Sequence, residues 1–275
     1  MKRFEGILIC TDLDGTLLRG DKSISEENLQ AIEYFKSQGG RFTFITGRMP
    51  YFVTDICEAI KPNAPFGCIN GGGLYDYGAK SYVWQQTLPR EAFELVEYVV
   101  NMLPGIGYHV NTFEKTYFIA ENSAMAHFRR VTGQPNLTCH HRDINEPIAK
   151  IVFGDDDTER IERLDALLRA HPNAEHFDFI RSEKTLYEIL PKDIHKGVAL
   201  QKMCEHLGLS MEKTVAAGDY NNDIGMLRVA KCGVAVANAT EETKAVADHI
   251  TVSNEEHAIA QIIKDIENGV IAIAL

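Results

Sequence analysis

Short apolar runs alternate with amphipathic stretches over the first third of the chain, and this pattern is typical of a parallel α/β sheet. Ile7–Cys10 is a continuous apolar run, which predicts a strand that is covered on both faces. Two further strands are expected over Phe42–Ile45 and Phe66–Ile69. Ser23 and Glu26 have the spacing of a capping box, and apolar residues follow at helical spacing on one face. A second helix is expected over Pro50–Ile60, because proline is favoured in the first turn of a helix.

The middle of the chain has a different pattern. Helix-like stretches are expected near Arg90–Met102, Asn122–Val131 and Asp157–Ala170. Strand-like pieces separate them, at Gly107–Val110, Thr116–Ala120, Ala149–Phe153 and Phe177–Arg181. Such a mixture predicts an α+β module built on an antiparallel sheet.

The βα alternation returns after Pro191. Helices are expected over Lys196–Leu207, Asn222–Ala230 and Glu255–Glu267, and strands over Thr214–Ala217 and Gly233–Ala237. We therefore predict one α/β domain that is interrupted by an inserted second domain. The expected limits are 1–82 and 189–275 for the α/β domain and 83–188 for the insertion.

The composition is that of a globular protein. Of the 275 residues, 45% are hydrophobic and 24% are charged, which excludes a disordered, collagen-like or coiled-coil chain. The formal net charge of −11 repels nucleic acid and anionic membranes, so neither is expected as a partner. No apolar stretch approaches the roughly 18 residues that span a bilayer, and a secretory leader is not expected, so we predict a cytoplasmic protein.

Two carboxylates stand directly after the first predicted strand, in Asp12-Leu13-Asp14-Gly15-Thr16. In a doubly wound sheet, ligands bind outside the carboxyl ends of the strands. Asp12 and Asp14 are close enough for one cation to engage both, and Gly15 allows the turn that this needs. Two like charges so close together are costly without a cation or a proton between them. The alternative is a pair of solvated turn residues, because Asp-Gly is a common turn pair.

Two further segments offer groups that suit a phosphate. The strand Phe42–Ile45 ends in Thr46-Gly47-Arg48, where a hydroxyl precedes a glycine whose backbone can approach an anion closely. Lys196-Gly197 places an ammonium near a helix N-terminus, where anions are favoured. Taken alone, the first is compatible with an ordinary turn and the second with an exposed lysine.

A fourth polar segment, Gly218-Asp219-Tyr220-Asn221-Asn222-Asp223, lies between an apolar strand and a helix. Mg²⁺ binds proteins through one or two carboxylates together with waters and substrate phosphate. Asp219 can supply a metal oxygen directly. Asn222 and Asp223 can hold waters, the phosphate or Lys196, although a polar helix cap is the alternative interpretation.

Together these four segments closely resemble the four motifs of the haloacid dehalogenase-like phosphatases. The large insertion resembles that of the Cof-type subfamily, and Asn70-Gly71 with the following Gly72-Gly73 is similar to a segment before the subfamily's cap domain. The resemblance implies a Rossmann-like parallel-sheet core with an inserted α+β cap domain. It also implies Mg²⁺-dependent hydrolysis of small phosphate esters, such as sugar phosphates or related metabolites.

The resemblance also implies a role for each matching residue. Asp12 matches the nucleophile and Asp14 the general acid and base, while Asp12, Asp14 and Asp219 match the magnesium ligands. Asp223 matches a supporting acid. The residues that match phosphate or substrate binding are Thr46, Gly47, Lys196, Asn222 and Asn70. The acid at position 14 favours phosphate chemistry over dehalogenation.

Two alternatives share this set of residues. A phosphomutase or other phosphotransferase would use the same core and nucleophile but pass the phosphoryl group to an acceptor. A non-enzymatic phospho-acceptor would keep a long-lived phosphate on Asp12, although Asp14 could activate the water that removes it. The expected partner is a small phosphate ester, and the expected assembly is a monomer or a homodimer.

Overall fold

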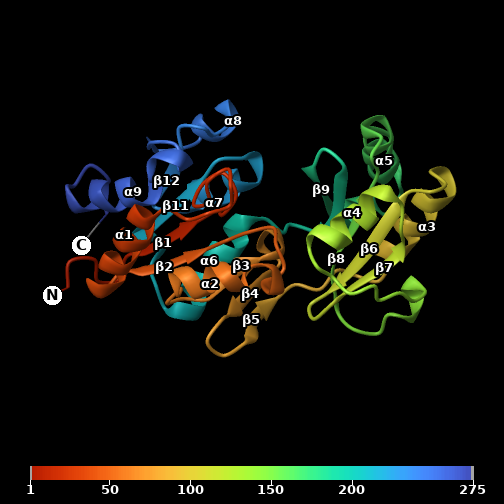
Figure 1. Ribbon diagram of the computed structural model, residues 1–275, viewed down its shortest axis with the longest axis horizontal. Helices are drawn as coiled ribbons and strands as arrows, with labels where there is room; N and C mark the ends of the chain where they lie inside the picture. The colour runs from red at the N-terminus through yellow and green to blue at the C-terminus, as the bar shows by residue number, and fades with distance from the viewer. Residues whose placement is uncertain (1, 274–275) are drawn as a thin grey trace. The chain divides into compact units, whose positions relative to one another are not determined.

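The chain divides into two compact units in the computed structural model, which describes residues 2–273 (Figure 1). The core unit comprises Met1–Gln85 with His195–Leu275, and the inserted unit comprises Gln86–Ile194. The expected limits after residues 82 and 188 fall inside strands β5 (Ser81–Gln85) and β10 (Leu186–Pro191). The observed division keeps both strands whole.

A five-stranded parallel sheet lies at the centre of the core unit, in the order β13-β12-β11-β1-β2. Its strands are β1 (Leu8–Thr11), β2 (Arg41–Phe44), β11 (Thr214–Gly218), β12 (Cys232–Ala235) and β13 (His249–Ile250). Every residue of β1 and β11 is buried, which explains why these strands are continuous apolar runs rather than alternating patterns. The predicted parallel core is confirmed.

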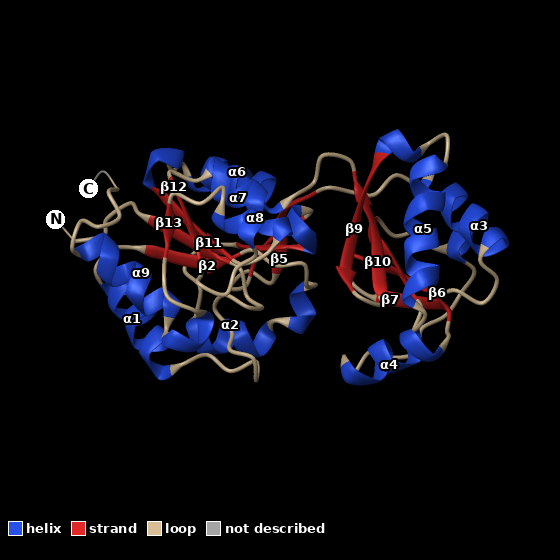
Figure 2. Ribbon diagram, turned by 90° about the horizontal axis from the view of Figure 1, so that it is seen from above, coloured by secondary structure: helices blue, strands red, loops and turns tan. Residues whose placement is uncertain are grey.

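Helices cover both faces of this sheet. They are α1 (Glu26–Ser37), α2 (Thr54–Ile60), α6 (Lys196–Leu207), α7 (Ile224–Val229), α8 (Glu241–Lys244) and α9 (Ala258–Glu267). Figure 2 shows α1, α2 and α9 on one side of the sheet and α6 and α7 on the other. On α6, Leu200 and Met203 are fully buried in one cluster with Leu8 of β1. Burial of side chains of this size stabilises the fold by about 1.5–3 kcal/mol each.

Several predicted helices are shorter or begin elsewhere. The cap of α1 is Ser25, whose hydroxyl accepts the Asn28 N–H, so the capping box predicted at Ser23 is wrong. Three predicted helices each divide into a short 3-10 helix and an α-helix: Pro50–Phe52 before α2, Asn221–Asp223 before α7 and Asn254–Glu256 before α9. His257 separates the last pair with a left-handed φ of +64°, which apolar periodicity does not reveal.

The third predicted strand forms β3 (Phe66–Cys68), which is not part of the parallel sheet. It pairs antiparallel with β4 (Gly73–Asp76), which in turn pairs with β5, and a single bridge joins Gly67 to Ile45 beyond β2. Ile69, predicted within the strand, instead has a φ of +56°, and Asn70 follows with +52°. Such left-handed conformations are uncommon for non-glycine residues and place Asn70 in a sharp turn.

The inserted unit contains a five-stranded antiparallel sheet in the order β7-β6-β8-β10-β9. Besides β10, its strands are β6 (Gly107–Thr112), β7 (Thr116–Ala120), β8 (Ile148–Gly154) and β9 (Phe177–Glu183). Its helices are α3 (Ala92–Met102), α4 (Ser123–Val131) and α5 (Thr158–Ala170). The predicted α+β module on an antiparallel sheet is confirmed, although the sequence pattern did not predict β10.

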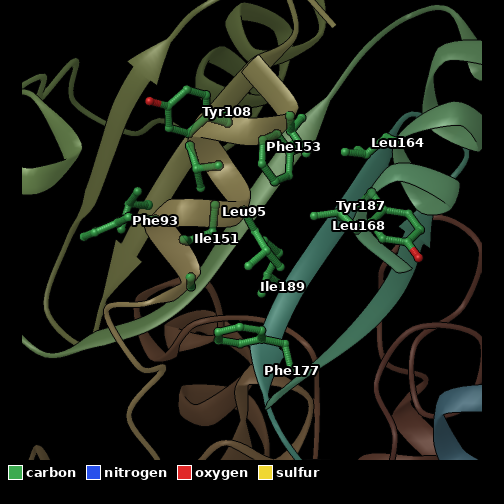
Figure 3. Close-up of a cluster of buried hydrophobic side chains, with 14 of the residues drawn as sticks. Phe93, Leu95, Tyr108, Ile151, Phe153, Leu164, Leu168, Phe177, Tyr187 and Ile189 are labelled. Carbon is green, nitrogen blue, oxygen red and sulfur yellow. The ribbon is translucent and has the colours of Figure 1, made fainter. Parts of the chain in front are cut away.

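One face of this second sheet is apolar and packs under α3 and α5. Figure 3 shows Phe93 and Leu95 of α3 and Leu164 of α5 among side chains such as Ile151 and Ile189 from the central strands. All five are at most 2% exposed. The opposite face of the same strands carries His109 of β6, Lys150 of β8 and Glu188 of β10, which are also buried.

Candidate active site

The site is built where β1 and β11 end side by side. These strands pair in parallel, and the Asp12 N–H donates to the Ala217 carbonyl at 2.8 Å. Asp12 follows β1 and Asp219 follows β11, so both carboxylates start from the same edge of the sheet. Asp12, Asp219 and Asp223 each offer a carboxylate oxygen, and the three oxygens lie within 4.8 Å of one another.

A buried lysine lies between two of these carboxylates. Lys196 is 1% exposed, and its Nζ lies 2.7 Å from Asp12 Oδ1 and 2.6 Å from Asp223 Oδ1. It is the first residue of α6, and the preceding His195 caps the helix by accepting the Gly197 N–H on its ring at 3.1 Å. The other oxygen of Asp223 accepts the backbone N–H groups of Asp219 and Tyr220. Asp223 therefore fixes both the ammonium and the loop that carries Asp219.

The carboxylates outnumber the ammonium. Burial and repulsion from Asp223 raise the pKa of Asp12 to about 8, although Lys196 opposes the shift. Burial, again with repulsion from Asp223, raises the pKa of Asp219 to about 6. Burial alone would lower the pKa of Lys196, but Asp12 and Asp223 outweigh it and raise the pKa above its usual value. Repulsion between the three carboxylates therefore destabilises the folded site, and a bound cation would offset this repulsion.

This donor set fits a hard divalent cation. Mg²⁺ prefers oxygen ligands and usually takes one or two protein carboxylates together with water and phosphate. Both oxygens of Asp223 already have protein partners, which leaves Asp12 and Asp219 as the carboxylates best placed to bind a metal. In the described part of the chain, no other group of three such side chains comes together.

Asp14 does not join this acidic group. Its carboxylate accepts two hydrogen bonds from Arg48, at 3.0 Å to Oδ2 and 2.7 Å to Oδ1, and a third from Lys22 at 2.8 Å. Burial raises the pKa of Asp14, but the bonds from Lys22 and Arg48 outweigh it and lower the pKa overall. The structure thus orients the Asp14 side chain toward two cations rather than toward the other acids.

The Thr46 and Asn70 segments meet through their backbones. The Asn70 N–H donates to the Thr46 carbonyl at 3.0 Å, and Asn222 donates to the Asn70 side chain at 3.3 Å. A Cβ on Gly47 would lie 2.9 Å from Asn70 Oδ1, so a larger residue would displace this amide. Gly71 has a φ of +105°, and a Cβ there would lie 2.2 Å from the His195 carbonyl oxygen. The turn therefore packs directly on the start of α6.

Three residues of the site had no role in the sequence prediction. Thr16 donates its hydroxyl to Asp219 Oδ1 at 3.0 Å, and Arg48 and Lys22 hold Asp14. Thr16 and Arg48 lie inside segments that were predicted to form the site. Their spacing in the sequence does not reveal that Thr16 contacts Asp219 or that Arg48 contacts Asp14. Lys22 has a left-handed φ of +68° in a turn, and its position in the sequence gives no signal of a contact with Asp14.

Comparison with known proteins extends these observations. The family model described as haloacid dehalogenase-like hydrolase matches residues 9–263. A 5-amino-6-(5-phospho-D-ribitylamino)uracil phosphatase of Bacillus subtilis is 27% identical, with 94% of this chain and 96% of that protein covered. A pyridoxal phosphate phosphatase of Escherichia coli is 28% identical, with 93% and 97% covered.

A solved structure supports the same conclusion. The haloacid dehalogenase-like hydrolase from Bacteroides thetaiotaomicron matches with a TM-score of 0.83 and 26% identity, covering 95% of this chain and all of that one. The predicted fold class and the predicted phosphatase activity are confirmed by these relatives. Within residues 2–273, no helix is both long enough and apolar enough to cross a membrane. Because one family model covers most of its length, the chain belongs to the haloacid dehalogenase-like hydrolases.

Proposed function

We propose that the chain is a Mg²⁺-dependent phosphatase of small phosphomonoesters, sugar phosphates or related metabolites, and that the residues around Lys196 perform the chemistry. The observation that supports this proposal most directly is the Lys196 ammonium between Asp12 and Asp223, with Asp219 beside them. The two named relatives act on small phosphorylated metabolites, according to their names, which supports the same substrate class.

Asp12 is the proposed nucleophile. Its carboxylate oxygen attacks phosphorus, an aspartyl phosphate forms, and the bond from phosphorus to the alcohol oxygen breaks. Water then attacks the aspartyl phosphate, which releases inorganic phosphate and restores the carboxylate. Two displacements of this kind replace one more difficult step. The short contact with Lys196 holds Asp12 in a fixed orientation for the attack.

Asp14 is the proposed general acid and base. It gives a proton to the leaving alcohol oxygen and afterwards takes one from the attacking water. Arg48 and Lys22 both donate hydrogen bonds to Oδ1 of Asp14. The other oxygen, Oδ2, accepts one hydrogen bond, from Arg48, and keeps a lone pair that can take the proton. The two cations therefore orient Asp14 without using up the oxygen that exchanges the proton.

The remaining predicted residues receive binding roles. Thr46 and Gly47 supply a hydroxyl and a backbone N–H to the phosphate oxygens, and Lys196 supplies positive charge. Asn70 and Asn222, which are hydrogen-bonded to each other, border the same phosphate site. Groups of this kind stabilise the charge that spreads over the equatorial oxygens in phosphoryl transfer.

The proposed metal ligands are the Asp12 and Asp219 carboxylates and the Asp14 backbone carbonyl. Asp223 supports them through Lys196 and the Asp219 N–H, and Thr16 orients Asp219. Bound Mg²⁺ would offset the repulsion between the Asp12 carboxylate and a phosphate dianion. We further propose a cytoplasmic monomer or homodimer whose partner is a small phosphate ester, without nucleic-acid or membrane partners.

The proposal is tested by measuring phosphate release from a panel of phosphorylated metabolites, with Mg²⁺ and with a chelator. The Asp12→Asn variant should lose activity about 10³-fold or more, because the amide cannot act as the nucleophile. Asp55→Asn, at an exposed position of α2, is the matched control and should keep full activity.

Three outcomes would contradict the proposal. Near-normal turnover by a folded Asp12→Asn protein would exclude the nucleophile. Transfer of phosphate to a sugar acceptor without release of free phosphate would identify a phosphotransferase instead. A phosphate on Asp12 that persists for hours would identify a phospho-acceptor.

A further inference from the structure

The turn Gly15–Leu18 contacts both oxygens of the Asp219 carboxylate. Thr16 is fully buried and donates its hydroxyl to Asp219 Oδ1 at 3.0 Å. Gly15 has a left-handed φ of +79°, and a Cβ at this position would collide with Asp219 Oδ2. One oxygen is therefore bonded to the turn and the other is packed against it, so a displacement of the turn would displace the carboxylate.

Two asparagines from later segments of the chain hold this turn. Asn238 lies between β12 and α8, and its Nδ2 donates to the Gly15 carbonyl at 2.8 Å. Its Oδ1 accepts the Asn254 N–H at 3.0 Å, and Asn254 Nδ2 donates to the Leu18 carbonyl at 2.9 Å. One asparagine therefore binds the first residue of the turn, the other binds the last, and the two are bonded to each other.

The segment that carries Asn238 is also bonded to the backbone on both sides of the Gly218–Asp219 peptide. The Val236 N–H donates to the Gly218 carbonyl at 3.2 Å, and the Thr240 N–H donates to the Asp219 carbonyl at 2.9 Å. Because β11 and β12 pair in parallel, both segments start from the same edge of the sheet. Asn238 is thus fixed relative to the Asp219 backbone, and its amide fixes the turn that orients the Asp219 side chain.

Asn63 makes the same pair of hydrogen bonds at another place in the core unit. Its Oδ1 accepts the Phe42 N–H at 2.8 Å, and its Nδ2 donates to the Gly40 carbonyl at 3.0 Å. These partners lie at the start of β2, which is parallel to β1, so they are at the opposite edge of the sheet from Asp12. Both Asn63 and Asn238 are exposed, so losing either amide should cost similar stability.

We propose that Asn238 is a positioning residue of the metal site, which holds the Asp219 carboxylate in its metal-binding orientation through the Gly15–Leu18 turn and the Thr16 hydroxyl. This inference rests on the proposed function and adds to it a residue that acts on the metal through one of its ligands. Removal of a residue that orients a metal ligand typically lowers metal affinity by about 10–100-fold.

The test measures Mg²⁺ binding directly by isothermal titration calorimetry, beside steady-state kinetics with p-nitrophenyl phosphate. The variants are Asn238→Ala, Thr16→Val and the double variant, and Asn63→Ala is the matched control. Thr16→Val removes the hydroxyl but keeps the branched shape, whereas Thr16→Ser keeps the hydroxyl. Thermal denaturation in the presence of a chelator checks the folding and the stability of each variant.

We expect the Kd for Mg²⁺ to rise about tenfold in Asn238→Ala and in Thr16→Val, but less than about twofold in Thr16→Ser and Asn63→Ala. Because Asn238 acts through Thr16, the double variant should lose much less than the product of the two single losses, which is about 100-fold. The metal-free Tm should fall by similar amounts in Asn238→Ala and Asn63→Ala. At saturating Mg²⁺, KM for p-nitrophenyl phosphate should change less than about twofold in Asn238→Ala.

Three results would overturn the inference. An unchanged Kd in folded Asn238→Ala would show that the turn holds Asp219 without this amide, and equal losses of affinity in Asn238→Ala and Asn63→Ala would show a general effect of stability. A double variant whose loss equals the product would show that Asn238 does not act through Thr16. If Thr16→Val does not fold, the comparison of Asn238→Ala with Asn63→Ala decides the question. Failure of the unaltered protein to bind Mg²⁺ or to hydrolyse p-nitrophenyl phosphate would instead overturn the proposed function.

Discussion

Each unit of the molecule contains a buried lysine, and the two lysines have different surroundings. Lys196 in the core unit contacts two carboxylates, and a third lies beside them. Lys150 in the inserted unit contacts one, from Glu188, at a similar distance of 2.8 Å. Around Lys196, three carboxylates and one ammonium leave an excess of negative charge. The charges of Lys150 and Glu188 compensate each other.

This difference in charge separates a site that suits a cation from an ion pair that is already compensated. A buried excess of negative charge is stabilised by a cation, so the acidic group of the core unit suits a divalent metal ion. A balanced pair surrounded by amide and imidazole groups has little to gain from a further charge.

The largest effect that tests this comparison is expected from Lys196→Met. Removing the ammonium leaves three neighbouring carboxylates, so the free energy of unfolding of metal-free protein should fall by about 3–5 kcal/mol. Lys150→Met should cost less, because it leaves one buried carboxylate rather than three. Urea denaturation in the presence of a chelator measures both values, and Lys202→Met, at a 39% exposed position on α6, is the control. Equal costs for the two buried lysines would contradict the comparison.

A second effect concerns acid stability and the buried His109 of β6. Burial, with a smaller effect from Lys150, lowers the pKa of His109 to about 3. As the pH falls below about 6.5, the unfolded chain binds a proton that the folded chain does not. The stability that neutral His109 provides is therefore complete above pH 6.5 and is lost between pH 6.5 and 3.

At pH 4.5 this loss amounts to about 2–3 kcal/mol relative to pH 7.5, and His109→Phe should remove it. Urea denaturation at the two pH values measures the difference, with His127→Phe at an exposed position of α4 as the control. An unchanged acid dependence in His109→Phe would show that His109 is not the group that takes up the proton.

The smallest effect is expected from Arg48→Met. Arg48 is partly exposed and binds Asp14 through two hydrogen bonds. It therefore differs from the two buried lysines, because it orients a carboxylate without being buried. Its loss should lower kcat about tenfold with little change in KM, because Asp14 is less well positioned for proton transfer. Steady-state kinetics check this, and Arg48→Lys should recover part of the loss. A rise in KM alone would assign Arg48 to substrate binding instead.

The fold was predictable from sequence where burial is complete on both faces of a strand. Ile7–Cys10 and Thr214–Ala217 are continuous apolar runs and correspond to β1 and β11 with small shifts. The helix over Lys196–Leu207 was predicted with its observed limits. Strand β10 was not predicted, because Glu188 interrupts its apolar run and the Lys150 that compensates this charge lies 38 residues away.

The sequence predicted those residues of the candidate site whose positions are determined by the ends of the strands. Asp12 and Asp219 come together because parallel neighbouring strands end at one edge of a sheet. The direction of a side chain beyond the strand is not fixed by any periodicity, so the contacts of Asp14 with Arg48 and Lys22 could not be derived. The catalytic roles of these residues stay predictions until they are tested.

The start of α6 has a consequence for protein engineering. Lys196 is the second residue after the division between the units, and His195, the first, both caps the helix and contacts the Gly71 turn through its carbonyl group. A chimera that exchanges the inserted unit must therefore be joined before His195, with no residue added between it and Lys196. At the other junction, a join after Gln85 keeps β5 intact. The two junctions thus differ in how many added residues they tolerate. We expect the junction before His195 to tolerate fewer added residues than the junction after Gln85.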